Sequence, residues 1–248
     1  MRRQCAAPSF QELSGICMDY LVNGFSSALA LLAHMDAATL SAIYATLLST
    51  CYAMTAALLL GLPMGFALGY CSFPGRRALR LVSDTLLAFP TVLIGLLVYA
   101  FITARGPLGQ YGLLFTLPGM AVGQAVLALP IVVSWTAQAV ESLDPRCRET
   151  LLTLGANARQ VTALSLWECR YSIGMVCITA FGRVITEVGV AMMLGGNIRY
   201  ATRTMTTAIA LETSKGDFAQ GIALGLILLL MAFVINLVLA FFRHRERA

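Results

Sequence analysis

Residues 144–156 read DPRCRETLLTLGA and lie inside a polar, arginine-containing segment, Glu141–Arg170, that separates two long apolar blocks. Asp144 is a favourable helix N-cap, and Pro145 suits the first helical position, where its missing N–H costs nothing. Gly155 predicts a sharp turn at the other end, because glycine readily adopts left-handed backbone conformations. The stretch therefore predicts a short helix, capped and stopped, in a connection much longer than a hairpin needs.

The composition is typical of a membrane protein. The hydrophobic fraction is 58%, the charged fraction is 12% and the mean hydropathy is +0.79, whereas soluble proteins average roughly 25% charged residues. No charged residue occurs between Asp36 and Arg76 or between Asp217 and Arg243. Because a bilayer-spanning helix needs about 20 mostly apolar residues, the chain is predicted to be an all-α integral membrane protein. The segment 141–170 then offers a docking element to a soluble partner.

Five spans are predicted from the apolar runs. They lie at about 40–71, 79–103, 118–140, 172–194 and 218–242. The first three contain Pro63, Pro90 and Pro130 respectively. Either these prolines make irregular helices around a cavity, or they are ordinary kinks, since proline is frequent in membrane helices.

The basic residues are divided unevenly between the two sides of the predicted membrane. One side receives Arg76, Arg77, Arg80, Arg146, Arg148, Arg159, Arg170, Arg243, Arg245 and Arg247. The connections on the other side hold only Arg105, Arg199, Arg203 and Lys215. Because connections rich in arginine and lysine stay in the cytoplasm, the segment 141–170 and the C-terminus are predicted to be cytoplasmic.

Residues 1–35 are expected to form a separate N-terminal segment, followed by one membrane domain at 36–248. The apolar stretch 16–33 is interrupted by Asp19 and Asn23. Its apolar residues recur at helical spacing, which favours an amphipathic helix lying in the membrane interface. Two arginines near the N-terminus favour the alternative, a sixth span.

Known catalytic and metal-binding motifs are absent from the sequence. The seven cysteines show no C-x-x-C spacing, and the two histidines belong to no catalytic or metal-ligating group. No P-loop, G-x-S-x-G or H-E-x-x-H motif occurs. The net charge of +5 is explained by the cytoplasmic arginines, so no nucleic-acid partner is implied.

The cytoplasmic segment resembles the EAA motif of ABC-importer permeases, in which a coupling helix sits in a groove of a separate ATPase subunit. Glu149 and Gly155 have the spacing of the motif's glutamate and glycine. Thr150 and Leu151 replace its two alanines, and Trp167 stands where the family commonly has a proline. Nearby stretches also look like permease spans, namely GLPMG at 61–65, FPTV at 89–92 and ALPI at 128–131.

Further motifs resemble the permease subunit of tungstate ABC importers, which are relatives of the molybdate and sulfate importers. These motifs are FGRVITEVG at 181–189, GGNI at 195–198, TTAI at 206–209 and LETSKGDF at 211–218. The resemblance implies a type I ABC-importer permease (MetI-like) fold with five core transmembrane helices, in a bacterial or archaeal cell (inner) membrane. It also implies alternating-access import of a tetrahedral oxyanion, tungstate first, with molybdate or sulfate as alternatives.

The same resemblance implies the partners. The chain is expected to form a homodimer that joins two ABC ATPase subunits and receives the oxyanion from an extracytoplasmic binding protein. ATP and Mg²⁺ would bind the ATPase, so this chain is expected to bind no cofactor and to catalyse no reaction itself.

The resemblance also assigns a set of residues to ATPase coupling. They are Arg148, Glu149, Leu152, Leu154, Gly155 and Ala156. The two charged residues would contact the ATPase subunit, while the two leucines anchor the helix in its groove. The alternative is a solvated surface helix with mixed charges.

Two further groups are candidates for the translocation pathway or gate. Arg183 and Glu187 lie one helical turn apart inside the fourth span, where an ionised side chain is costly unless paired or hydrated. They either line the pathway or form a structural ion pair. Gly195, Gly196 and Asn197 follow, with Arg199 nearby. They predict either a backbone nest that binds anions or a simple helix stop.

Two other classes of membrane protein remain as alternatives. An enzyme acting on lipid or polyprenyl substrates would need clustered carboxylates or histidines, whereas the twelve acidic residues are scattered along the chain. A secondary carrier would usually show an internal repeat and more than five or six spans.

Overall fold

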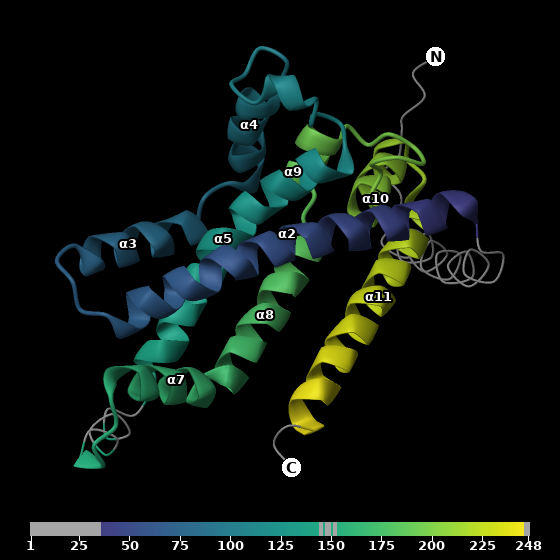
Figure 1. Ribbon diagram of the computed structural model, residues 1–248. Helices are drawn as coiled ribbons and strands as arrows, with labels where there is room; N and C mark the ends of the chain where they lie inside the picture. Colours follow the sequence, from purple (N-terminus) through teal and green to yellow (C-terminus); the bar gives the residue numbers. More distant parts are fainter. Residues whose placement is uncertain (1–35, 144–145, 147–149, 151–152, 246–248) are drawn as a thin grey trace, which may run out of the picture.

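The computed structural model describes residues 36–143, 146, 150 and 153–245, and every regular element among them is helical. Figure 1 shows the helices in sequence order from purple to yellow. They are α2 (Ala37–Tyr70), α3 (Arg76–Leu87), α4 (Thr91–Ile102), the 3₁₀ turn η1 (Gly109–Tyr111), α5 (Leu117–Glu141), α7 (Ala158–Glu168), α8 (Arg170–Ile185), α9 (Gly189–Gly195), α10 (Met205–Ser214) and α11 (Phe218–Arg245). The segment 1–35, and with it the choice between an interfacial helix and a sixth span, lies outside the described residues.

Three of the helices are long and apolar enough to cross a membrane without interruption, namely α2, α5 and α11. Two bent pairs, α3 with α4 and α8 with α9, have the length and composition of one span each. Up to five spans result, and the predicted all-α membrane architecture is confirmed. Pro63 and Pro130 lie inside helices that continue past them, so the helices are not interrupted at these two prolines.

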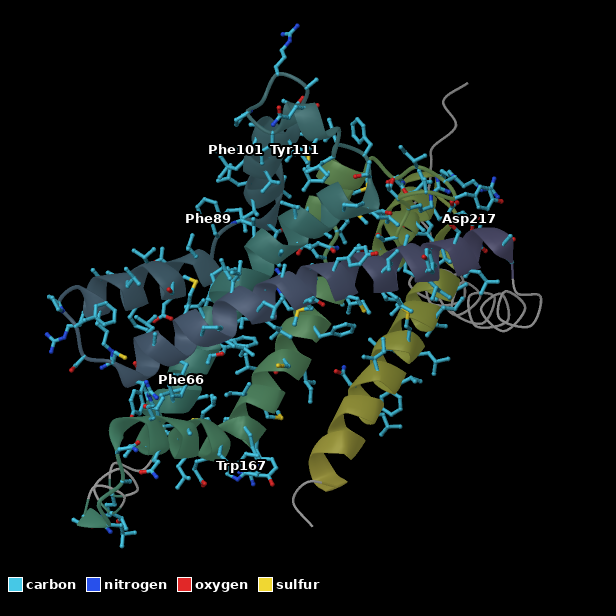
Figure 2. The ribbon with its side chains drawn as sticks, in the orientation of Figure 1. Phe66, Phe89, Phe101, Tyr111, Trp167 and Asp217 are labelled. Carbon is cyan, nitrogen blue, oxygen red and sulfur yellow. The ribbon has the colours of Figure 1, made fainter. Side chains whose placement is uncertain are left out.

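The second predicted span, 79–103, is not one straight helix. α3 and α4 meet at an angle of 103°. Pro90 lies between them as the N-cap of α4. Proline has no N–H to donate, and it disfavours helical geometry in the preceding residue, Phe89, which Figure 2 labels at this bend.

The fourth predicted span, 172–194, is also broken. α8 and α9 meet at 58°, and no proline lies at the break. Instead the side chain of Glu187 accepts hydrogen bonds from the first N–H groups of α9. A side chain that satisfies these backbone donors replaces the intrahelical bonds that a continuous helix would make.

Two of the long helices, α2 and α5, pack closely against each other. Gly61 faces Val132 and Gly65 faces Thr136, so the two helices advance in the same direction. A Cβ atom on Gly65 would lie 2.7 Å from both the Thr136 Cβ and the Val133 carbonyl oxygen. Glycines spaced by four residues thus let the two backbones approach closely, as small residues do in membrane helix pairs.

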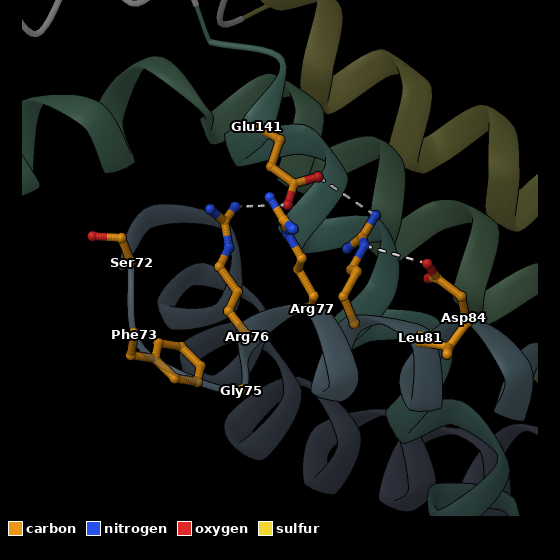
Figure 3. Close-up of a pocket in the computed structure, with 9 residues that line it drawn as sticks. Ser72, Phe73, Gly75, Arg76, Arg77, Leu81, Asp84 and Glu141 are labelled. Carbon is orange, nitrogen blue, oxygen red and sulfur yellow. Dashed lines mark hydrogen bonds and ion pairs between the residues drawn. The ribbon is translucent and has the colours of Figure 1, made fainter.

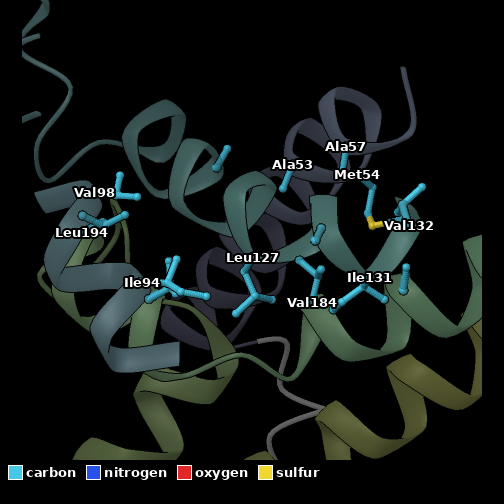
Figure 4. Packing of buried hydrophobic residues seen from close by; sticks show 14 of the residues in the cluster. Ala53, Met54, Ala57, Ile94, Val98, Leu127, Ile131, Val132, Val184 and Leu194 are labelled. Carbon is cyan, nitrogen blue, oxygen red and sulfur yellow. The ribbon is translucent and has the colours of Figure 1, made fainter. Parts of the chain in front are cut away.

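The main apolar core fills the space between α2, α4, α5, α8 and α9 (Figure 4). Its buried residues are mostly alanine, valine, leucine and isoleucine, for example Ala53, Ile94, Leu127 and Val184. In contrast, α11 stands to one side and contacts chiefly α10 (Figure 1). Large apolar side chains on α11 are exposed, as expected of a helix that meets lipid or another chain.

Candidate functional site

The polar segment 141–170 contains the turn that the sequence predicts. The Leu154 N–H donates to the Thr150 carbonyl at 3.1 Å, a helical hydrogen bond. Gly155 follows with φ +79°, so the left-handed turn is confirmed. Leu154 is 77% exposed and Ala156 is partly exposed. Arg148, Glu149 and Leu152 lie outside the described residues.

A second helix in this segment, α7, was not predicted. Its N-cap, Asn157, accepts a hydrogen bond from the Gln160 N–H at 2.9 Å, and the Gln160 side chain accepts one from the Asn157 N–H at 2.8 Å. The spacing N-x-x-Q was the available signal, because it forms a capping box. α7 carries several exposed apolar side chains, among them Leu164 and Leu166.

The corner between α7 and α8 is built around Arg170. Its guanidinium carbon lies 4.6 Å from the Trp167 ring centroid and 4.1 Å from that of Tyr171. One guanidinium nitrogen also donates to the Trp167 carbonyl at 2.7 Å. Figure 2 labels Trp167 at this corner. Cation–π stacking and the hydrogen bond therefore fix how α8 leaves the polar segment.

Charged side chains meet at the far end of α5, around a cavity of about 670 Å³ (Figure 3). Glu141 pairs with Arg76 at 2.8 Å and with Arg80 at 3.7 Å. Arg80 also pairs with Asp84 at 3.4 Å. This cluster was missed, since residues 65 positions apart in sequence give no pairing signal of their own.

Arg183 and Glu187 form the predicted ion pair, with an N–O distance of 3.0 Å. The Glu187 side chain is only 4% exposed, and its other carboxylate oxygen accepts from the Gly189 N–H at 2.9 Å. Thr206 donates to the Glu187 carbonyl at 3.0 Å. Glu187 therefore satisfies backbone donors at the break between α8 and α9, and a role in the pathway stays a prediction.

Arg183 is placed differently from its partner. Its side chain is 46% exposed, although it lies near the middle of the bent pair α8–α9. A guanidinium has five N–H donors, and one hydrogen bond, to Glu187, is observed. An ionised group at this depth costs several kcal/mol against lipid tails. The exposed face of Arg183 therefore has to meet water or another polypeptide.

The loop after α9 has the geometry of a helix stop. Gly196 is the C-cap of α9 in the left-handed conformation, and its N–H donates to the Met192 carbonyl at 3.1 Å. Arg203 donates to the Asn197 side-chain oxygen at 3.0 Å and to its carbonyl at 3.3 Å. The loop is thus closed by bonds within the chain, and Gly195 beside it is buried. Binding of an anion here stays a prediction.

Arg199 lies on the surface beside this loop. Its guanidinium carbon is 4.9 Å from the Tyr200 ring centroid. Together with Arg203 and Lys215 it lines a cavity of about 240 Å³, to which Asp36 and Glu212 also contribute. The cavity carries charges of both signs, so it is a weaker attractor of anions than the arginines alone suggest.

The nearby threonines are used inside the chain. Thr204 and Thr207 form the capping box of α10. Thr46 of α2 accepts the Met205 N–H at 2.9 Å. Thr202 donates to the Gly195 carbonyl. These hydroxyls satisfy the backbone where α9, α10 and α2 meet.

Comparison with known proteins places the chain among transporters. The family model of the binding-protein-dependent transport system inner membrane component matches residues 61–248. The chain belongs to this family. The tungstate uptake system permease protein of Campylobacter jejuni is 45% identical over 226 residues, which cover 91% of this chain and 95% of that relative. The protein of the same description from Peptoclostridium acidaminophilum is 35% identical, over 90% and 97% of the two chains.

The fold of this inner membrane component is also that of a solved importer. A chain of a bacterial alginate ABC transporter, solved with an alginate-bound periplasmic protein, has a TM-score of 0.70 at 19% identity. The similarity covers 92% of this chain and 88% of the other. The ABC-importer permease fold is therefore shown, independently of the sequence relatives.

In this inner membrane component the candidate residues fall into separate places. The described part of the coupling segment lies beyond one end of α5, beside the Glu141 cluster. Arg183 and Glu187 lie near the middle of the α8–α9 pair. Gly195, Gly196, Asn197 and Arg199 lie at its opposite end. The candidate residues are therefore separated into one group beyond the end of α5, one ion pair within a bent span and one charged surface loop.

Proposed function

We propose that this chain is the membrane-spanning subunit of an ABC importer that moves tungstate into the cytoplasm. The observation that carries the substrate is the 45% identity, over 91% of this chain, to a tungstate uptake permease. Two copies of the chain would form the pathway, and two ABC ATPase subunits would supply the energy. An extracytoplasmic oxyanion-binding protein would deliver the substrate, while this chain itself binds no ATP and performs no covalent chemistry.

The half-exposed Arg183 supports a pathway between two copies. Its open donors need a polar environment in the membrane. A water-filled pathway along the exposed face of α8 provides one, and a guanidinium offers two parallel hydrogen bonds to a tetrahedral oxyanion. Glu187 would hold Arg183 in place from behind while capping α9.

The turn at Gly155 supports the docking of the ATPase at the segment 141–170. Leu154 projects from this turn with 77% of its surface exposed. The same segment carries further exposed apolar side chains, Leu164, Leu166 and Trp167, and exposed apolar patches mark interaction sites. On this proposal the segment and the C-terminus lie in the cytoplasm.

Uptake measurements on the complete importer test the substrate. The chain would be reconstituted in proteoliposomes with its ATPase subunits and binding protein, and ATP-dependent uptake of tungstate, molybdate and sulfate would be compared. We expect tungstate to be preferred. All three are tetrahedral dianions, so a preference for molybdate or sulfate would change the proposed substrate and would not contradict the assignment as a permease. Failure of this chain to co-purify with any ATPase would overturn the permease assignment itself and favour a membrane enzyme or a secondary carrier.

A further inference from the structure

Glu141 is the last residue of α5, and the segment proposed to dock the ATPase begins directly after it. Its two carboxylate oxygens bind different arginines of α3. One oxygen lies 2.8 Å from an Arg76 guanidinium nitrogen, and the other lies 3.7 Å from an Arg80 nitrogen. The start of α3 is therefore tied to the point where the polar segment leaves the membrane domain (Figure 3).

Arg76 also holds the end of α2. Its Nε donates to the Leu68 carbonyl at 2.7 Å, and a terminal nitrogen donates to the Gly69 carbonyl at 3.0 Å. The last carbonyls of a helix lack intrahelical partners, so a guanidinium is a suitable group to satisfy them. Arg76 thus joins the ends of α2 and α5 to the beginning of α3.

Arg80 makes a second connection, one turn further along α3. It donates to the Ser134 carbonyl of α5 at 2.7 Å. The Ser134 hydroxyl in turn donates to the carboxylate of Asp84, which pairs with Arg80. These polar contacts link α3 to α5 over two successive turns.

Apolar burial does not attach α3 to the rest of the chain. None of its twelve residues, all of which the structure describes, is buried. Leu79, Leu81 and Val82 are exposed, while Arg76 and Arg80 are only partly so. The arginines therefore face the protein and the leucines face outward. The polar contacts to α5 and α2 are what position α3.

We propose that Glu141, Arg76 and Arg80 form a positioning clamp that makes α3 follow the end of α5. When an ATPase moves the polar segment, the clamp carries that displacement into α3 and, through the bend at Pro90, into α4. A partly exposed ion pair adds little to folding stability. The role that we propose for the clamp is therefore to transmit motion rather than to stabilise the fold. This inference rests on the proposed function, because it needs an ATPase docked on the segment after Glu141.

Charge-removing variants of the complete importer test the clamp. Glu141→Gln and Arg76→Gln would be reconstituted with the ATPase subunits and binding protein, and tungstate uptake per ATP hydrolysed would be measured. We expect ATPase co-purification to be unchanged and uptake per ATP to fall about five- to tenfold, the range of a modest coupling free energy. The double variant should lose less than the product of the two single losses, since both substitutions remove the Glu141–Arg76 contact.

Arg77→Gln is the matched control. Arg77 lines the same cavity and lies in the first turn of the same helix, yet it has no hydrogen-bond or ion-pair partner among the described residues. Its removal should leave uptake per ATP unchanged. An equal loss in Arg77→Gln would overturn the clamp in favour of a general effect of charge.

Two other results would also overturn the clamp. One is full uptake per ATP in Glu141→Gln, and the other is loss of ATPase binding in that variant, which would assign Glu141 to docking. Failure of the proposed function looks different, because the wild-type importer would then take up no tungstate.

Discussion

The two residues of the Arg183–Glu187 ion pair differ in burial and in their other contacts. Glu187 is buried and uses both carboxylate oxygens inside the chain, on Arg183 and on the first N–H groups of α9. Arg183 makes one of those bonds and presents the rest of its guanidinium on the surface of α8. The sequence left open whether the pair is structural or lines the pathway, and the two roles are not exclusive. Glu187 bonds within the chain, whereas the Arg183 guanidinium still has exposed N–H donors that could meet a ligand.

Substitutions at the two positions should have different effects. We expect Arg183→Lys, which keeps a positive charge for Glu187, to lower tungstate uptake roughly tenfold with little change in thermal unfolding, because a lysine cannot form the two parallel hydrogen bonds of a guanidinium. Arg183→Ala should lower uptake as well, and it should also lower the unfolding temperature because it leaves the buried Glu187 carboxylate without its partner. Glu187→Ala removes the cap of α9 and leaves Arg183 unpaired, so it should lower the unfolding temperature in detergent. Normal uptake in both Arg183 variants would show that Arg183 does not contribute to the pathway.

Bends within spans and close contacts between helices determine how the helices are arranged. Pro90 separates α3 from α4, while Pro63 and Pro130 leave α2 and α5 continuous. Glycines bring helices together in both cases: Gly61 and Gly65 of α2 face α5, and Gly95 of α4 faces Val190 of α9.

The α2–α5 contact predicts a contrast between two glycines. Gly65→Ala places a Cβ 2.7 Å from the Val133 carbonyl oxygen, and overpacking of this kind costs about 1–3 kcal/mol. Gly174→Ala in α8 meets no atom within 4 Å. It should be neutral or stabilising by up to about 1 kcal/mol, since alanine is the better helix former. Unfolding temperatures of the two purified variants measure the difference, and equal temperatures would contradict the close packing.

The exposed turn at Leu154 predicts a docking defect without a folding defect. Leu154→Glu places a charge where an apolar side chain would enter the ATPase groove, so less ATPase should co-purify. Thr153→Glu is the neighbouring control on the same exposed turn, and it should retain more of the ATPase. The membrane domain itself should unfold at the wild-type temperature in both variants. Undiminished co-purification in Leu154→Glu would exclude this residue from the interface.

For the whole molecule, the positive-inside rule and the fold agree on one orientation. The Glu141 cluster, the polar segment and the end of α11 lie toward one end of the helices, whereas α10 lies toward the other (Figure 1). The arginines of the first group outnumber those of the second. This end is predicted to face the cytoplasm.

Thiol labelling measures this orientation. Cys71 follows α2 directly and is exposed. In a variant that keeps Cys71 alone, a membrane-impermeant maleimide should label inside-out vesicles and not intact spheroplasts. The converse pattern is expected when Arg105→Cys, on the opposite side of the bent pair, is the sole cysteine. Labelling of Cys71 from outside would reverse the topology.

Much of the fold could be predicted because apolar runs report membrane spans directly. The break at Glu187 could not, since it depends on a carboxylate that bonds to N–H groups further along the chain rather than on a proline. The cluster around Glu141 depends on residues brought together by the fold. α7 did have a local signal, the capping box at Asn157 and Gln160, within a segment that the sequence treated as carrying one helix.

The glycine contact between α2 and α5 limits how this molecule can change shape. Sliding of these two parallel helices would bring side chains into clash, and separating them would lose close contacts, so we expect α2 and α5 to move together. The remaining freedom lies at the bends of 103° and 58°. On the proposed function, we expect a switch between outward and inward access to change the angles at these two bends while α2 and α5 keep their mutual packing.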